Sequence, residues 1–161
     1  MFGFIDFLIL NSMMSHHSRG SESDSIPPPV GISAKIDAIK NDLGYGFSTG
    51  FFEPMVAAAT TAAFVDGVTE EKKQEALSKA ENFKSFSLIS ITRKIINKQP
   101  IPFQELKQYL NQVNPHYYDV LDYFIWQTML GTEDLSDNQK LFIAQWNNYR
   151  HSRCHPTENN N

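Results

Sequence analysis

Apolar residues recur every three or four positions through most of the chain between residues 31 and 150. This spacing places them on one face of an α-helix, whereas a half-buried strand requires alternation in steps of two. No alternating run of useful length appears, so we predict an all-α domain of about seven helices. The predicted helices span about residues 32–43, 51–64, 69–83, 87–97, 102–113, 114–130 and 136–150.

Polar residues and prolines mark several of the predicted helix ends. The hydroxyl of Thr69 can cap the helix that follows it, and Asn114 before Pro115 is a capping residue followed by a first-turn proline. Ser136 and Gln139 have the spacing of a capping box, in which each side chain accepts a hydrogen bond from the backbone of the other. These local signals support the helix boundaries that the apolar spacing predicts.

The second predicted helix is unusual because it is rich in alanine. The sequence MVAAATTAAF (residues 55–64) has small residues on several sides. Neighbouring helices can approach such a backbone closely, so we expect this helix to be central in the domain.

Two segments of the chain have the same pattern. VDGVTEEKKQEA (residues 65–76) and TEDLSDNQKLFI (residues 132–143) each follow an apolar helix with an acidic turn, an apolar residue, a hydroxyl cap and the start of a new helix. The pattern predicts two degenerate helix–turn–helix repeats.

The first of these segments resembles the TerB-like domain of bacterial tellurite-resistance and stress-response proteins. The resemblance is carried by Asp66-Gly67-Val68-Thr69-Glu70-Glu71-Lys72 after MVAAATTAAF, and it extends over residues 51–149. It implies a non-enzymatic helical module in bacterial stress, tellurite or phage-defence responses, which binds protein partners and divalent cations. This chain departs from the family pattern at Lys72, where a glutamate is common, and in the second turn, where Glu133-Asp134 replaces Asp-Gly.

The acidic residues of the two turns are candidate ligands for a hard cation such as Ca²⁺ or Mg²⁺, which bind carboxylate oxygens. They lack the twelve-residue spacing of an EF-hand, so an ion site requires the two turns to converge. The alternative is that the turns only connect helices, with acids placed favourably at helix starts. The candidate ligands are Asp66, Glu70, Glu71, Glu133, Asp134 and Asp137.

Aromatic residues are dense in the last two predicted helices. Most should pack in the core, and those that remain at its rim can form a partner-binding surface, as Tyr and Trp often do. The candidate partner-binding residues are Tyr117, Tyr118, Tyr123, Trp126, Trp146 and Tyr149.

Composition excludes several classes of function. The 161 residues suit one domain, and a net charge of −4 lacks the basic surface that nucleic-acid binding requires. No motif of nucleophilic, phosphate-binding or metal-dependent catalysis occurs, so we do not expect an enzyme.

His151, Cys154 and His155 are candidate zinc ligands, but a structural zinc site needs four ligands and this segment offers three. We also predict that residues 151–161 form a flexible tail. We therefore do not expect a functional zinc site.

Residues 1–30 differ from the rest of the chain. MFGFIDFLIL is apolar, but it is shorter than the roughly 20 residues of a transmembrane helix and lacks the positive start of a signal peptide. Residues 1–12 are a candidate for peripheral membrane or partner contact, unless Met13 or Met14 is the true start. A Ser- and Pro-rich linker, which we predict to be disordered, follows.

We expect the protein to be cytoplasmic, and residues 1–12 offer a means of associating with a membrane. The alternative function is a phage- or mobile-element-encoded adaptor or structural protein that docks through this N-terminus and the aromatic C-terminal helices.

Overall fold

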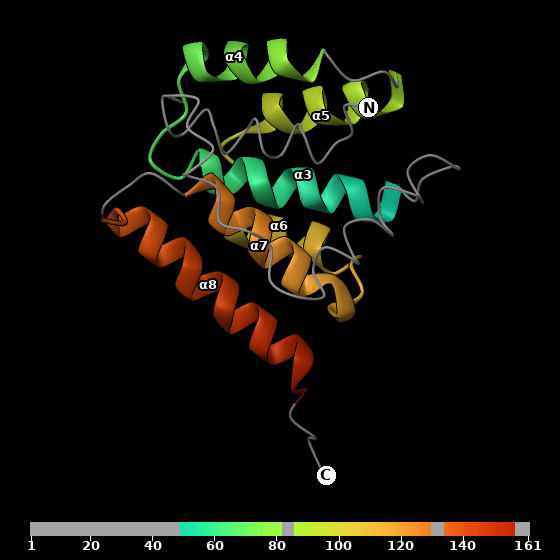
Figure 1. Cartoon of the computed structure of the whole chain (residues 1–161), viewed down its shortest axis with the longest axis vertical. Helices are drawn as coiled ribbons and strands as arrows, with labels where there is room; N and C mark the ends of the chain where they lie inside the picture. The colour runs from blue at the N-terminus through green and yellow to red at the C-terminus, as the bar shows by residue number, and fades with distance from the viewer. Residues whose placement is uncertain (1–48, 82–85, 130–133, 157–161) are drawn as a thin grey trace.

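The computed structural model describes residues 49–81, 86–129 and 134–156. These ranges contain α-helices and one short 3₁₀ helix but no strand, which confirms the all-α prediction. The predicted helix at residues 32–43 lies outside the described residues, so the count of seven helices stays a prediction, as does the repeat. The elements are α3 (Thr49–Ala63), α4 (Glu70–Ala80), α5 (Phe86–Lys98), α6 (Phe103–Leu110), η2 (Pro115–Tyr117), α7 (Tyr118–Thr128) and α8 (Asp137–Cys154) (Figure 1).

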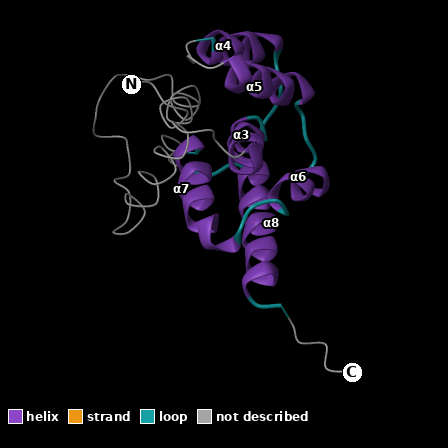
Figure 2. Ribbon diagram, turned by 90° about the vertical axis from the view of Figure 1, so that its right-hand side faces the viewer, coloured by secondary structure: helices purple, strands orange, loops and turns teal. Residues whose placement is uncertain are grey.

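Helix α3 is the centre of the bundle. It contacts α5, α6 and α7, and α4 packs on α5 as an outer layer. Helices α4 and α5 therefore lie on one side of α3, with α6, α7 and α8 on the other (Figures 1 and 2). None of the described helices is long and apolar enough to cross a membrane.

The small residues of α3 explain its central position. Ala57, Ala58, Ala59 and Ala62 are all buried, and short side chains let three helices approach the α3 backbone. Larger side chains fill the remaining space around this helix, among them the buried Phe52. Burial of this apolar surface is the main stabilising contribution to the bundle.

A buried amide satisfies the polar groups at the end of α3. Gln99, only 3% exposed, donates from Nε2 to Thr60 Oγ1 (2.9 Å) and to Thr61 Oγ1 (3.1 Å). Its Oε1 accepts from the backbone N–H of Ile101 (3.1 Å), and Thr60 Oγ1 donates to the Val56 carbonyl (2.6 Å). These bonds, here called the Gln99 clamp, fasten the α5–α6 connection to α3.

Helix α8 begins where the sequence predicts and ends later than predicted. Both hydrogen bonds of the Ser136–Gln139 capping box are present. The helix continues through Cys154, four residues beyond the predicted end at residue 150. Burial of Tyr149 holds this end of α8 against the bundle, and the His155 N–H donates to the His151 carbonyl at 2.9 Å.

Replacing Gln99 with leucine should destabilise the protein although the side-chain size is similar. Gln99→Leu leaves the Thr61 hydroxyl and the Ile101 N–H without their partner in a buried place, which costs about 1–3 kcal/mol. Urea unfolding followed by circular dichroism measures this loss. The control is Gln112→Leu, at an exposed glutamine, which should stay within about 0.5 kcal/mol of wild type. Equal losses in the two variants would show that the clamp contributes nothing specific.

Candidate functional site

The two acidic turns meet in the structure. Ser136, the N-cap of α8, donates from Oγ to Oδ1 of Asp66 in the turn after α3, at 2.6 Å. These residues are 70 positions apart in the sequence. The Ser136 oxygen also accepts from the Gln139 N–H at 3.1 Å, so one hydroxyl both caps α8 and joins the turns. We call this contact the turn junction.

Gly67 allows the first turn to take its shape. Its φ of +143° lies in a region that L side chains rarely adopt, although a Cβ would meet no atom within 4 Å. The requirement for glycine therefore comes from the backbone rather than from crowding. Thr69 then caps α4 as predicted, with its Oγ1 accepting from the Lys72 N–H at 3.2 Å.

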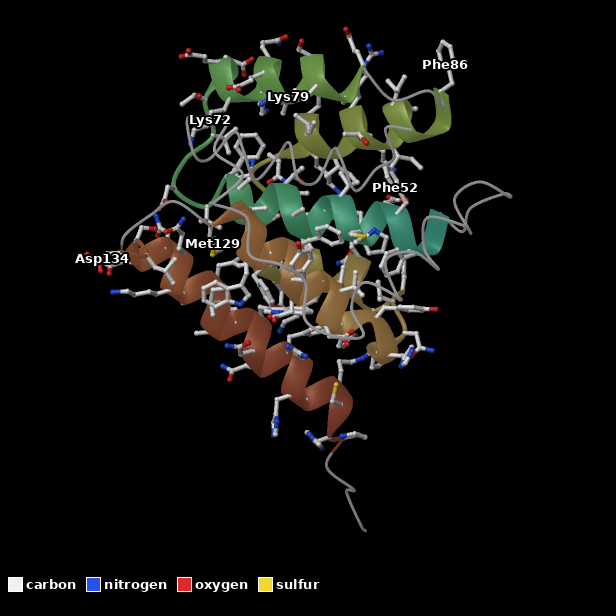
Figure 3. The ribbon with its side chains drawn as sticks, in the orientation of Figure 1. Phe52, Lys72, Lys79, Phe86, Met129 and Asp134 are labelled. Atoms are coloured by element: carbon white, nitrogen blue, oxygen red, sulfur yellow. The ribbon has the colours of Figure 1, made fainter. Side chains whose placement is uncertain are left out.

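The other acidic candidates do not gather around the turn junction. Glu70, Glu71 and Asp137 are exposed in the first turns of their helices, and Asp134 is exposed and points away from the bundle (Figure 3). Glu133 lies outside the described residues. Among residues 49–81, 86–129 and 134–156, no three His, Cys, Asp or Glu side chains are grouped to hold a metal ion. The Ca²⁺ or Mg²⁺ site stays an untested alternative to turns that only connect helices.

Three of the six aromatic candidates for partner contact are buried in the core. Tyr118, Trp146 and Tyr149 are buried and in mutual contact, with ring centroids 5.6–6.3 Å apart. The Trp146 Nε1–H donates to Asp122 Oδ1 at 2.8 Å, and the Tyr149 hydroxyl donates to Asn111 Oδ1 at 2.7 Å. Burial, followed by the hydrogen bond with Tyr118, raises the pKa of Tyr149 well above its usual range. These rings pack and hydrogen-bond inside the bundle.

The other three aromatic candidates are half-buried. Tyr117 packs edge-on against Phe51 at 5.4 Å, and Tyr123 packs against Phe124 at 5.3 Å. Burial raises the pKa of Tyr123. Trp126 is also half-buried, so these three residues stay candidates for partner contact.

A groove that the sequence analysis did not predict runs along α8. Near the turn junction, a hollow of about 260 Å³ lies between the end of α3, the α5–α6 connection and α8. Its floor includes the buried Phe64 and Ile101, and its edge includes Leu141, which is 57% exposed. A second hollow of about 270 Å³ shares Phe103 and Gln145 with the first. We call the two together the α8 groove.

One stripe of α8 supplies a wall of the α8 groove. Besides the buried Phe142 and Tyr149, the exposed lining positions of α8 follow one another at intervals of three, four, three and four, which places them on a single helical face. They are Asn138, Leu141, Gln145, Asn148 and Ser152. The stripe was readable in the sequence as a 3–4 repeat, but its single apolar residue gave no sign that it borders a groove.

The chemistry of the α8 groove is that of a binding surface. The described lining combines apolar residues with uncharged amides and hydroxyls, and its one charged residue is Lys107, whose Nζ lies 6.0 Å from the centroid of the Phe103 ring. Amides can donate to and accept from a peptide backbone, and the apolar floor can receive a side chain. The described lining contains no His, Cys, Asp or Glu.

Comparison of the chain with protein-family models, with curated proteins and with solved structures gives no match. The resemblance to TerB-like domains therefore depends on the turn motif alone and stays a prediction.

A double-mutant cycle tests whether the turn junction couples the two turns. Ser136→Ala should cost about 1 kcal/mol through loss of the cap, and Asp66→Ala should cost less. Their sum should exceed the cost of the double variant by about 0.5–1 kcal/mol, because either change alone breaks the shared hydrogen bond. The matched control pairs Asp66→Ala with Asn114→Ala, the side-chain cap of η2, and should be additive. Free energies of urea unfolding give all four terms, and additivity in the Ser136 cycle would exclude coupling.

A titration tests the hard-cation site. We expect Ca²⁺ and Mg²⁺ to give no saturable heat and no rise in melting temperature, because the described carboxylates are dispersed and Ser136 already bonds Asp66. Binding to the native state alone would raise the melting temperature by mass action. Saturable binding that disappears in Asp66→Asn would contradict this expectation and would identify the turns as an ion site.

Proposed function

We propose that this chain is a non-enzymatic, TerB-like helical module that binds a protein partner through the α8 groove in a bacterial stress, tellurite or phage-defence response. The observation that supports binding is the position of Leu141, a largely exposed apolar side chain at the edge of a hollow with a buried apolar floor. Exposed apolar surface of this kind, bordered by polar groups, is typical of protein interaction sites.

The size and shape of the groove favour a protein segment as the ligand. Each hollow, at about 260–270 Å³, is smaller than the usual small-molecule site of about 300–1,000 Å³. The two hollows follow one another along α8 and share lining residues, so a bound chain can place successive side chains in them. This arrangement suits a ligand that is long and narrow.

An amphipathic helix is the partner that we favour. A helix laid along a groove presents anchor residues at intervals of three and four, and the α8 stripe has the same intervals. Leu141 would contact the apolar anchors, while Asn138, Gln145 and Asn148 would hydrogen-bond polar groups of the ligand. Because these amides are uncharged, the groove should bind neutral helices in preference to strongly charged ones.

The turn motif supports membership of the TerB-like family. Gly67 has the backbone conformation that favours glycine, and Thr69 caps the following helix, so the residues that carry the resemblance have defined structural roles. The stress and tellurite context comes from the resemblance, and the binding function comes from the groove. These two parts of the proposal can be tested separately.

Substitution of Leu141 by aspartate tests the binding function. Leu141→Asp should weaken partner binding at least tenfold, about 1.4 kcal/mol, because it puts a charge where an apolar anchor must pack. The control is Ala144→Asp, an exposed position on α8 outside the groove lining. Both variants should keep near wild-type stability, since both sites are exposed. Photo-cross-linking from position 145 in native cells, with position 144 as the control, identifies the partner whose binding is then measured.

Two outcomes separate the parts of this proposal. Equal cross-linking from positions 145 and 144, or equal binding by the two aspartate variants, would exclude the α8 groove as the partner site. If wild-type protein does not restore tellurite, stress or phage tolerance to cells that lack it, the stress assignment is wrong even where the groove binds.

A further inference from the structure

Two histidines lie side by side at the C-terminal end of α8. His151 and His155 are separated by one helical turn, and their ring centroids are 4.9 Å apart. Both side chains are exposed. His151 lies in the last turn of α8, and His155 is the C-cap residue directly after the helix, with a φ of −129° and a ψ of 68°. Their i, i+4 spacing is the one by which helical zinc-binding motifs bring two imidazole groups together.

The backbone that carries this pair is held in place. The His155 N–H donates to the His151 carbonyl at 2.9 Å, and Ser152 Oγ donates to the Tyr149 carbonyl at 2.8 Å. Arg153 Nη1 donates to Asn111 Oδ1 at 3.3 Å, which fastens the last turn to the segment between α6 and η2. The helix therefore carries His151, and the backbone hydrogen bond from His155 holds the second histidine at the helix end.

The number of ligands determines what this pair can do. Zn²⁺ is bound tetrahedrally by four ligands in structural sites, and neutral imidazole is among its usual ligands. The described part of the chain brings no third His, Cys, Asp or Glu into a metal-binding group with the pair. One copy therefore supplies half of a structural zinc site.

We propose that His151 and His155 form half of a transition-metal site of the Zn²⁺ class, and that the same two residues of a second copy complete it. The end of α8 extends beyond the other helices (Figures 1 and 2), which leaves it accessible to another molecule. Two copies related by a two-fold axis place two pairs of imidazoles around one ion, giving four nitrogen ligands. The two arginines near the histidine pair already have partners within the protein. Arg150 forms an ion pair with Asp122 at 3.5 Å, and Arg153 donates a hydrogen bond to Asn111. The protein then forms a metal-dependent dimer, independently of any ligand in the α8 groove.

Sedimentation velocity of the full chain tests this proposal. Zn²⁺ should convert monomer to dimer with one ion bound per two chains, EDTA should reverse the change, and Mg²⁺ should have no effect. His151→Ala and His155→Ala should each abolish the dimer without loss of helix, because both side chains are exposed. His116→Ala, at an exposed histidine on η2, and the His16→Ala/His17→Ala double variant should dimerise as wild type does.

Several results would overturn the proposal. Zn²⁺ that leaves the protein monomeric, or that binds one ion per chain, would exclude a site shared between copies. A dimer that persists in both His151→Ala and His155→Ala, or that is lost in the His16/His17 variant, would place the ligands elsewhere. Cys154→Ser should retain the dimer, and its loss would show that the thiol rather than a second imidazole pair binds the ion.

Discussion

The burial of α3 on nearly all sides is the constraint on which the rest of the structure depends. A helix enclosed by three others needs small side chains where they approach, and its polar groups need partners inside the protein, because no water reaches them. Alanines meet the first requirement, and the Gln99 clamp meets the second for Thr60 and Thr61. The clamp also fixes the α5–α6 connection against α3, and this connection contributes Ile101 to the floor of the α8 groove. A requirement of the core therefore positions the candidate site.

Helix α8 is held at three points, and these contacts define the other wall of the groove. Its start is joined to the first turn by the bond from Ser136 to Asp66. Its middle is held by Trp146, which is buried and bonded to Asp122, and its end by the bond from Tyr149 to Asn111. The buried aromatic residues Trp146 and Tyr149 fix α8 in the bundle, and the adjacent exposed stripe of α8 borders the groove.

The sequence predicted those features of the fold that depend on interactions between residues close together in the chain. Periodicity and capping chemistry predicted the described helices, and the small residues of α3 indicated its central place. The burial of Gln99 was not predictable in this way, because an amide is buried only when tertiary structure supplies its partners, here Thr60 and Thr61. The last turn of α8 was missed for a similar reason. Its residues are polar, and they remain helical because Tyr149 and Arg153 bind Asn111, a residue that is distant in the sequence.

The two turns that are similar in sequence contact each other at the turn junction, but they use their similar residues differently. Both turns lead to a hydroxyl cap, but only Ser136 is shown to use its proton to bond an acid from the other turn. In the first turn Gly67 takes a positive φ, whereas the second turn has Asp134 two residues before its cap, at the position that matches Gly67. Aspartate disfavours that backbone region relative to glycine, so the sequence similarity between the turns does not extend to this position. The carboxylate–hydroxyl bond from Ser136 to Asp66 joins the two turns directly, and the acids at the starts of α4 and α8 are placed where a helix dipole favours negative charge.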